Sequence, residues 1–254
     1  MQGKNRSRIS YKIAYALRNP DRIAAYARRR GRDTLLRLTT RDHVSYYREV
    51  MRSDTSRSSD AAVGSKSRDA WLKLGQLQFD YLILHGLTPD MRMLDIGCGN
   101  LRGGRLFIDY LGAGGYYGTD ISPDILLSAQ HTITEFGLQR KLPHLALVSD
   151  LRLDFLPDDS FDVVHAHSVF SHSPLPVIEE CLAHVGRVMT PGGFFDFTFD
   201  RTDGAEHQVL REDFYYRAET LASLARRHGL DARFMADWEE TGHPQSKIRV
   251  TRPA

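Results

Sequence analysis

The sequence predicts an α/β fold in which a doubly wound, mostly parallel seven-stranded sheet ends in an antiparallel C-terminal hairpin, preceded by a helical N-terminal arm. Three observations predict this fold. Short apolar runs alternate with helix-like segments from residue 91 onward, a glycine-rich turn follows the first apolar run, and two β-like runs near the C-terminus lack a long helix between them. Repeated βα units favour a parallel sheet with helices on both faces.

The helices are predicted where apolar residues recur at helical spacing. They cover AWLKLGQLQFDYLILHGL, GRLFIDYL, SPDILLSAQHTITEFG, PLPVIEECLAHVGRVM and RAETLASLARRHG. The first has a broad apolar stripe formed by Trp71, Leu72, Leu74, Leu77, Phe79, Leu82 and Leu84. In the third, Ser122 is the expected cap and Pro123 the first helical residue.

The strands are predicted from the apolar runs that separate these helices. They are MRMLDI, GYYGTDI, HLALVSD, FDVVHAHS, FFDFTF, DARFMADW and SKIRVTR, with TPGG as a turn before the fifth. The last two strands form the antiparallel pair at the sheet edge.

The N-terminal residues differ in charge from the rest of the chain. Residues 1–60 contain 15 Lys and Arg against 6 Asp and Glu, whereas the remainder contains 19 against 26. We predict a basic helical extension over 1–60, a flexible linker over 61–70 and the main domain over 71–254. Such an extension can pack on the domain as a solvated arm, or it can contact phosphates or anionic lipid.

Composition also limits the location and partners of the protein. No run approaches the ~20 consecutive apolar residues of a membrane span, so we expect a cytoplasmic protein, with peripheral contact to an anionic inner membrane face through residues 1–60. Stable nucleic-acid binding is not expected, because the main domain is net acidic. The two cysteines, Cys98 and Cys181, lack the spacing of a disulfide framework or a metal site.

A glycine-rich turn lies between two acidic residues that each end a predicted strand. Asp95 precedes Gly97 and Gly99, and Asp120 ends the next strand. In doubly wound sheets a ligand binds in the crevice at the carboxyl ends of the strands. The glycines allow the backbone to approach a ligand closely. Asp120 is placed to accept hydrogen bonds from two ribose hydroxyls.

Asp95 favours one cofactor class over another. A dinucleotide places pyrophosphate over the glycine turn, where the Asp95 carboxylate would repel it. S-adenosylmethionine (SAM) has no phosphate and carries positive sulfonium and ammonium groups, which this carboxylate attracts. The glycine spacing is G-x-G-x-x-x-G rather than the dinucleotide G-x-G-x-x-G. The sequence therefore favours SAM over a nicotinamide or flavin cofactor.

From about Gln78 to the C-terminus the chain resembles the class I SAM-dependent methyltransferases. The resemblance rests on LDIGCGN, YYGTDIS, LVSDLRLDFLPDDSFDVVHAHSVFSH and VGRVMTPGG. One departure is Leu101, where many members have a third close glycine. The resemblance implies that the cofactor-binding residues are Asp95, Gly97, Cys98, Gly99, Asp120, Ile121, Asp150, Leu151, His167 and Ser168.

The resemblance assigns each part of SAM to different residues. Asp95 and the glycines flank the methionine part, Asp120 the ribose, and Asp150 with the Leu151 backbone the adenine. Cys98 contributes its backbone only. His167 and Ser168 lie beside the methionine and the methyl group. Asp150 has an alternative role in a loop of several solvated acids.

Histidines near the end of the fourth strand are the candidate bases. Proton removal by a positioned base helps a hydroxyl to attack the methyl group. His172 is the first choice, helped by its match to the SVF-x-H pattern found in part of this family, and a structural turn role is its alternative. His167 is predicted either to contact the cofactor or to act as the base. His165 is predicted as a hydrogen-bonded residue of the core or of a layer behind the site.

A second polar cluster follows the fifth strand. Asp200 and Asp203 are predicted to face the crevice, where they could bind acceptor hydroxyls or, with His207, a divalent ion; a solvated loop is the alternative. Aromatic residues 214–216 are read either as an acceptor wall or as core. No zinc site is predicted from the histidines.

The expected function is methyl transfer from SAM to a hydroxyl oxygen of a small metabolite, glycan or glycolipid. The alternative is carbon or nitrogen methylation of a polyketide, quinone or peptide. Methylation of a nucleic acid is the least favoured alternative. Methyl transfer is an in-line displacement, so the enzyme mainly aligns the attacking atom and excludes water.

Overall fold

The computed structural model describes residues 20–253, with side chains from residue 24 onward. The chain forms two compact units, residues 1–42 and 43–254. Within the first unit, α2 (Pro20–Thr39) is the described helix, and the part of the predicted arm at residues 1–19 lies outside the described residues. The second unit already begins at His43, so residues 43–60, predicted as part of the extension, belong to the same unit as the sheet.

The stretch predicted as a flexible linker is mostly ordered helix and turn. Residues 61–70 overlap the end of α4 (Ser59–Ala62) and the start of α5 (Arg68–Leu84), and α3 (His43–Thr55) lies before them. The hydroxyl of Ser58 accepts a hydrogen bond from the Ala61 amide and caps α4, and Ser67 caps the next helix in the same way. The serines that suggested flexibility therefore serve as helix caps.

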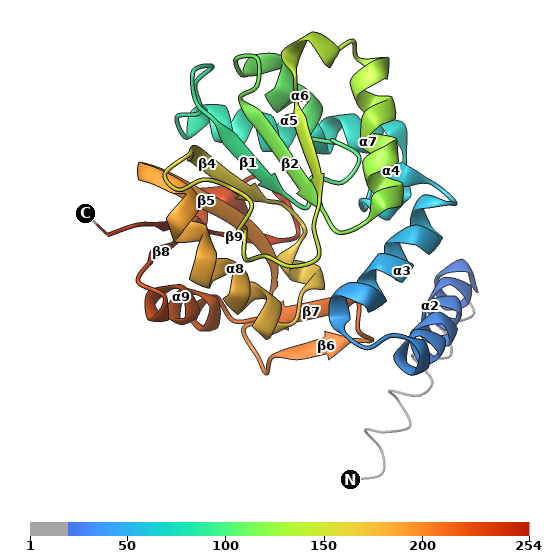
Figure 1. The fold of residues 1–254 in the computed structure, drawn as a ribbon. Helices are drawn as coiled ribbons and strands as arrows, with labels where there is room; N and C mark the ends of the chain where they lie inside the picture. Colours follow the sequence, from blue (N-terminus) through green and yellow to red (C-terminus); the bar gives the residue numbers. More distant parts are fainter. Residues whose placement is uncertain (1–19, 254) are drawn as a thin grey trace. The chain divides into compact units, whose positions relative to one another are not determined.

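Within residues 20–253, nine strands form one sheet (Figure 1). Seven follow the order β3-β2-β1-β4-β5-β9-β8, parallel from β3 to β5, with β9 antiparallel to both β5 and β8. This confirms the predicted fold class. The strands are β1 (Met93–Ile96), β2 (Tyr116–Asp120), β3 (His144–Leu147), β4 (Phe161–Ala166), β5 (Met189–Arg201), β6 (His207–Val209), β7 (Asp213–Tyr216), β8 (Asp231–Phe234) and β9 (Ser246–Thr251).

Two features of the sheet differ from the prediction. The short strands β6 and β7 form an antiparallel hairpin, and β7 pairs with the end of β5. The predicted TPGG turn lies inside β5, where Gly192 has a φ of +85° and the pairing with β4 shifts register between Phe161 and Val163. A strand can contain such a turn-forming sequence because an irregularity accommodates it without ending the pairing.

Helices cover both faces of the sheet and enclose two hydrophobic cores. One core joins the sheet to α8 (Leu175–Val188) and α9 (Ala218–Arg227). The other joins the opposite face to α5 (Arg68–Leu84), α6 (Gly104–Tyr110), α7 (Pro123–Glu135) and α10 (Ala236–Glu239). Burial of both faces explains why β1 and β4 are largely buried, whereas β3 at the sheet edge is partly exposed.

The helix boundaries largely follow the predicted ones. Ser122 caps α7, accepting from the Ile125 amide, and Pro123 is its first residue. In α5, Trp71 and Leu82 are fully buried, but Leu84 is 80% exposed. The last residue of the predicted apolar stripe therefore lies outside the hydrophobic core. Among the described residues, no helix has the length and apolar composition to cross a membrane.

Candidate cofactor and active site

The turn after β1 has the conformation that a closely approached ligand requires. Gly97 and Gly99 have φ values of +67° and +56°. A Cβ atom on Gly97 would lie 2.4 Å from Val169 Cγ2, and one on Gly99 would lie 2.8 Å from Val63 Cγ1, so neither position can carry a side chain without displacing a neighbour. Leu101, where the family often has glycine, also adopts the left-handed conformation, with a φ of +63°.

Asp120 connects this turn to the end of β2. Its two carboxylate oxygens accept hydrogen bonds from the Gly99 amide, at 3.0 Å, and the Ser122 amide, at 2.9 Å. The residue is 7% exposed. Burial raises the pKa of Asp120 to about 6, although the hydrogen bonds from the backbone act in the opposite direction. The carboxylate thus joins the end of β2 to the turn and is ionised at neutral pH, and its contact with the ribose stays a prediction.

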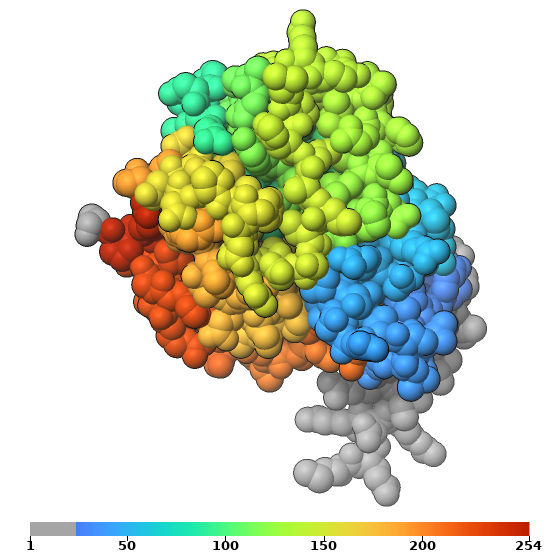
Figure 2. Space-filling view, viewed as in Figure 1, coloured from blue at the N-terminus to red at the C-terminus, as the bar shows by residue number. Residues whose placement is uncertain are grey.

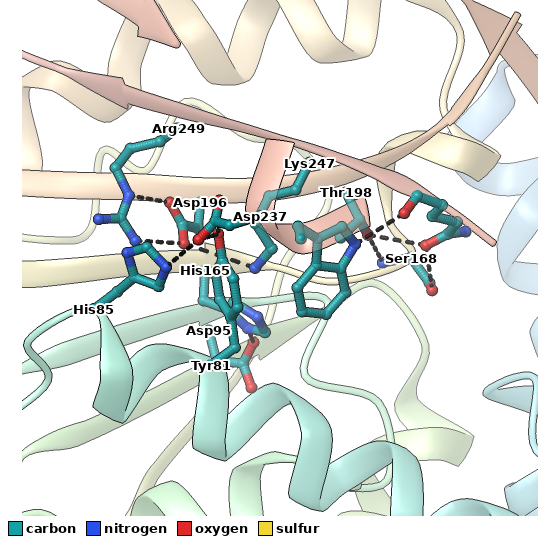
Figure 3. A network of polar contacts seen from close by, with 12 residues as sticks. Tyr81, His85, Asp95, His165, Ser168, Asp196, Thr198, Asp237, Lys247 and Arg249 are labelled. Atoms are coloured by element: carbon teal, nitrogen blue, oxygen red, sulfur yellow. Dashed lines mark hydrogen bonds and ion pairs between the residues drawn. The ribbon is translucent and has the colours of Figure 1, made fainter. Parts of the chain in front are cut away.

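Asp95 is held by side chains of neighbouring strands. One carboxylate oxygen accepts a hydrogen bond from Tyr116 Oη at 2.6 Å, and the other lies 3.1 Å from His165 Nδ1. Asp95 is 5% exposed and His165 1% exposed. His165 is thus a hydrogen-bonded residue behind the site, as predicted (Figure 3). Contact between Asp95 and the methionine part of SAM stays a prediction.

His167 is buried beyond the end of β4 with no hydrogen bond to either ring nitrogen. Its ring lies 4.9 Å from that of His243 and 5.9 Å from that of Trp238, measured between centroids. Burial and the positive charge of Arg102 lower the pKa of His167 well below its ordinary value. A buried polar side chain without partners is unusual in a native protein and suggests that a ligand completes its hydrogen bonding.

Ser168 follows with strained backbone geometry. Its φ is +59°, in the left-handed region that non-glycine residues rarely adopt. The Ser168 amide donates to Thr198 Oγ1 at 2.7 Å, and its hydroxyl donates to Gln245 Oε1 at 2.8 Å (Figure 3). These bonds hold the segment after β4 in the conformation that directs the chain toward His172.

The predicted adenine residues make contacts within the protein. Asp150 is exposed and accepts from the Arg152 amide, and the Leu151 amide donates to Glu180 Oε2 at 2.8 Å. The Ile121 carbonyl accepts from Arg48 Nε at 2.7 Å. The structure thus gives no support to adenine binding by the Leu151 amide, because α8 already supplies its partner.

Cys98 packs as a neutral thiol within the turn. It is 7% exposed, and burial raises the pKa of its thiol well above the ordinary value. Its Sγ lies so close to Gly118 that a Cβ there would approach it to 2.9 Å. This agrees with a backbone contribution and no thiol chemistry.

Helix α3 covers the carboxyl ends of β2 and β4, which the sequence did not predict. Arg48 bonds the Ile121 carbonyl, and it also bonds the Val148 carbonyl at 3.4 Å. The Tyr47 ring stacks on the His172 ring, with centroids 5.3 Å apart. In Figure 2 the surface of α3 adjoins that of the segment after β3. The sequence Tyr-Tyr-Arg at residues 46–48 could have drawn attention to this helix, but it matches no known motif.

His172 lies in a short 3-10 helix, η2 (Phe170–His172), with one ring nitrogen fixed. Nδ1 lies 2.7 Å from the Glu212 carbonyl oxygen and 3.5 Å from Asp213 Oδ1. Because a carbonyl can only accept, Nδ1 carries the hydrogen, and Nε2 of the neutral ring carries the lone pair. Burial lowers the pKa of His172, but its bonds to Asp213 and Glu212 outweigh burial and raise the pKa above its ordinary value.

The second polar cluster separates into different environments. Asp200 lies near His172, and burial raises its pKa although the His172 charge opposes this. Asp203 is 82% exposed and pairs with Arg201, so it does not face the crevice as predicted. The exposed His207 bonds the Ala205 carbonyl. Within residues 20–253, no three His, Cys, Asp or Glu side chains are grouped to hold a metal ion. The aromatic residues Phe214 and Tyr216 are mostly core, each 7% exposed.

The residues of the crevice fit SAM. Gly97 and Gly99 let the turn adopt its left-handed conformation against Val169 and Val63. Asp120 supplies a buried acceptor, and His167 supplies unpaired nitrogens. Comparison with known proteins agrees, since residues 94–195 match the methyltransferase domain family. This part of the chain is a methyltransferase domain of the class I SAM-dependent type. SAM is the cofactor of this family.

Relatives of this methyltransferase differ in what is known of them. An uncharacterized protein of Haemophilus influenzae is 29% identical over 143 residues, covering 55% of each chain. A sterol 24-C-methyltransferase of Gibberella zeae is 32% identical over 165 residues, covering 62% of this chain and 42% of the relative. The chain thus spans about half the length of the curated relatives it matches.

Solved structures share the fold of this methyltransferase. Magnesium protoporphyrin IX methyltransferase from Synechocystis, with bound SAM, aligns with a TM-score of 0.63 and 16% identity. The alignment covers 84% of this chain and 99% of that one. The likeness therefore extends well beyond the residues matched by the family.

Proposed function

We propose that this methyltransferase transfers the methyl group of SAM to a hydroxyl oxygen of a small metabolite, glycan or glycolipid. The observation that carries the proposal is the fixed tautomer of His172 beside the crevice. Its Nδ1 donates to the Glu212 carbonyl, so Nε2 is the nitrogen able to take a proton. Nε2 has no hydrogen-bond partner among the described residues.

The position of His172 relative to Asp120 supports its role. Tyr47 stacks on the His172 ring, and the charge of Asp120 helps to raise the pKa of Tyr47, after burial and the charges of Asp213 and Glu212. Tyr47 is therefore neutral beside the proposed base, and the next residue, Arg48, bonds the carbonyl of Ile121, which follows Asp120.

Different residues are proposed for proton removal, charge stabilisation and ligand contact. SAM, when bound, supplies an electrophilic methyl group on a sulfonium. Nε2 of His172 takes the proton of the acceptor hydroxyl as the oxygen attacks, and Asp213 stabilises the imidazolium that results. The Tyr47 ring of α3 covers one face of the imidazole, which stays about one third exposed (31%) and so can be reached by an acceptor. His167, neutral and unpaired, is proposed to contact the cofactor or acceptor rather than to remove the proton.

Labelled SAM with a panel of hydroxylated acceptors tests the activity, and His172→Gln tests the base. We expect the variant to retain the affinity for S-adenosylhomocysteine (SAH) and to lose about 10²- to 10⁴-fold in turnover. His207→Gln is the matched control, since His207 is exposed on β6. Full activity of His172→Gln would reject the base, and failure of the wild-type protein to bind SAH would reject the enzyme assignment.

Carbon or nitrogen methylation is the second candidate. The 32% identity to a sterol C-methyltransferase favours it. An activated carbon or a neutral amine needs less help from a base than an alcohol does. A product with its label on carbon or nitrogen, formed at equal rates by the wild-type protein and His172→Gln, would support this alternative over the first.

A further inference from the structure

The glycine turn leads directly into a buried cation without a counter-charge. Arg102 is 7% exposed, and no carboxylate of the described residues forms an ion pair with it. Its Nη1 donates to the Val63 carbonyl and to Ser65 Oγ, the latter at 3.4 Å. Its Nε has no hydrogen-bond partner at all. Burying an unpaired charge is costly, and buried cations in native proteins normally have an anionic partner.

An arginine of the described domain that is somewhat less buried, with 12% of its side chain exposed, does have a carboxylate partner. Arg249 forms a two-point ion pair with Asp196, at 2.6 and 2.8 Å. Burial lowers the pKa of Arg102 to about 10, while Asp95 and Asp60 partly compensate from a distance. The guanidinium therefore stays charged at neutral pH, and its charge is not neutralised by the protein.

The surroundings of Arg102 place it in the crevice. It follows Leu101, the last left-handed residue of the turn. Val63 joins the guanidinium to the glycine turn, because its carbonyl accepts from Arg102 Nη1 and its Cγ1 lies 2.8 Å from where a Cβ of Gly99 would be. In agreement, the charge of Arg102 lowers the pKa of both His167 and His243.

We propose that Arg102 binds the carboxylate of the methionine part of SAM. This inference rests on the proposed function, because it assumes that SAM occupies the crevice. The carboxylate is the one anionic group of SAM, and a guanidinium binds a carboxylate through two parallel hydrogen bonds. The free Nε and the planar fork of Arg102 are suited to that geometry. A carboxylate of the acceptor has the same chemistry, so the experiment separates the two sources.

The test compares SAH with its decarboxylated form, which lacks this carboxylate and retains the nucleoside, sulfur and amine. Calorimetry measures both ligands, without acceptor, on the wild-type protein, Arg102→Met and Arg102→Lys. We expect the wild-type protein to prefer SAH by about 10- to 100-fold, as for a hydrogen-bonded ion pair. Arg102→Met should reduce this preference to about one, and Arg102→Lys should retain part of it.

Arg105→Met is the matched control, because Arg105 lies one turn along and rests on the rings of Trp71 and Phe136. It should retain the preference for SAH. The melting temperature without ligand separates binding from structure. Arg102→Met removes a buried charge without a counter-charge but also the hydrogen bonds to Val63 and Ser65, so the melting temperature should change little.

Three outcomes would overturn the inference. They are equal binding of the two ligands by the wild-type protein, an unchanged preference in Arg102→Met, and a lower melting temperature of that variant with equal losses for both ligands. A wild-type protein that binds neither ligand would instead reject the proposed function, and this inference with it.

Discussion

At the scale of single residues, Asp120 has the most direct consequence for cofactor binding. Its pKa of about 6 means that it is ionised at pH 7.5 and mostly protonated at pH 5. A protonated carboxyl accepts fewer hydrogen bonds from ribose hydroxyls. We therefore expect the affinity for SAH to fall by up to about tenfold per pH unit below pH 6. Calorimetry from pH 5 to 8 checks this.

Asp120→Asn provides the control for this pH dependence. The amide does not titrate, so the variant should bind SAH more weakly at pH 7.5 and should lose the step near pH 6. A step of the same size in Asp120→Asn would show that another group is responsible.

Asp213 should set the pH at which the proposed base works. Its hydrogen bond and charge help to raise the pKa of His172 above the ordinary value, against the effect of burial. Because the base must be neutral to take a proton, the rate rises as pH increases through this pKa. Asp213→Asn should lower the pKa and move the acid limb of kcat/KM to lower pH. An acid limb at the same pH in Asp213→Asn would show that Asp213 does not raise the pKa of the base.

Leu101 offers a test of backbone strain in the turn. Glycine normally destabilises a protein relative to alanine, but a φ of +63° reverses this order. Leu101 is fully buried, so loss of its side chain costs about 2–5 kcal/mol, which exceeds the ~1–2 kcal/mol of strain. Both Leu101→Ala and Leu101→Gly should therefore lower the free energy of unfolding. Urea denaturation should find the glycine variant the more stable by about 1 kcal/mol; the opposite order would contradict the strain.

The sequence identified site residues where a strand end and a motif coincide. Asp120 and His172 were selected in this way, and their roles stay predictions. Arg102, Tyr116 and Tyr47 were missed, because nothing in a single sequence indicates that a buried arginine lacks a partner or which residue a tyrosine contacts. The Leu151 amide was assigned to adenine by resemblance alone, and its bond to Glu180 depends on α8, about 30 residues further along the chain.

At the scale of elements, a row of polar residues crosses the sheet on the face covered by α5 and α10. Asp95 pairs in register with His165, His165 with Asp196, and Asp196 with Arg249. Because neighbouring residues in register point to the same face, these four polar side chains lie side by side (Figure 3). Lys247 adds a second cation, 3.6 Å from Asp196 and 4.3 Å from the centre of the Trp238 ring.

Removal of the central carboxylate should be strongly destabilising. Asp196 is fully buried, and Asp196→Asn would leave Arg249 and Lys247 charged beside a neutral amide. We expect a loss of about 3–5 kcal/mol in the free energy of unfolding, measured with urea. The double variant Asp196→Asn with Lys247→Met should recover part of that loss. A loss below 1 kcal/mol in the single variant would contradict the ion-pair account.

The elements predicted well are those with strong periodicity. All seven main strands and the helices between them are present, since burial on one or both faces leaves a clear pattern. The β6–β7 hairpin was missed because its strands have three and four residues and mixed polarity. The predicted boundary at residue 71 is too late, because the second unit begins at His43. Serine-rich composition is typical of linkers and also of helix caps, and the sequence does not show which amides the serines bond.

At the scale of the whole molecule, the second compact unit contains every proposed cofactor residue. We therefore expect a protein that lacks residues 1–42 to bind SAH with the affinity of the full chain. Calorimetry on the two proteins checks this. A tenfold loss in the shorter protein would show that the first unit contributes to the site.

The first unit is also the proposed membrane contact. Helix α2 exposes Leu35 (61%) and Leu38 (83%) together with exposed arginines such as Arg28 and Arg37. An apolar stripe beside basic residues suits an anionic bilayer surface. In flotation with anionic liposomes, the full chain should rise with the vesicles and the protein lacking residues 1–42 should not. Equal flotation of the two would remove this proposal.

The acceptor of the His172 Nδ1 proton is a main-chain oxygen, delivered by the connection between β6 and β7. No exchange of the Glu212 side chain removes that oxygen, so the choice of reactive nitrogen survives point mutation. Transplanting the SVF-x-H segment into a related domain without this hairpin would carry over the imidazole and leave its proton free to occupy either nitrogen. The His172 side chain supplies the base, whereas the backbone between β6 and β7 decides which of its nitrogens is free to take the proton.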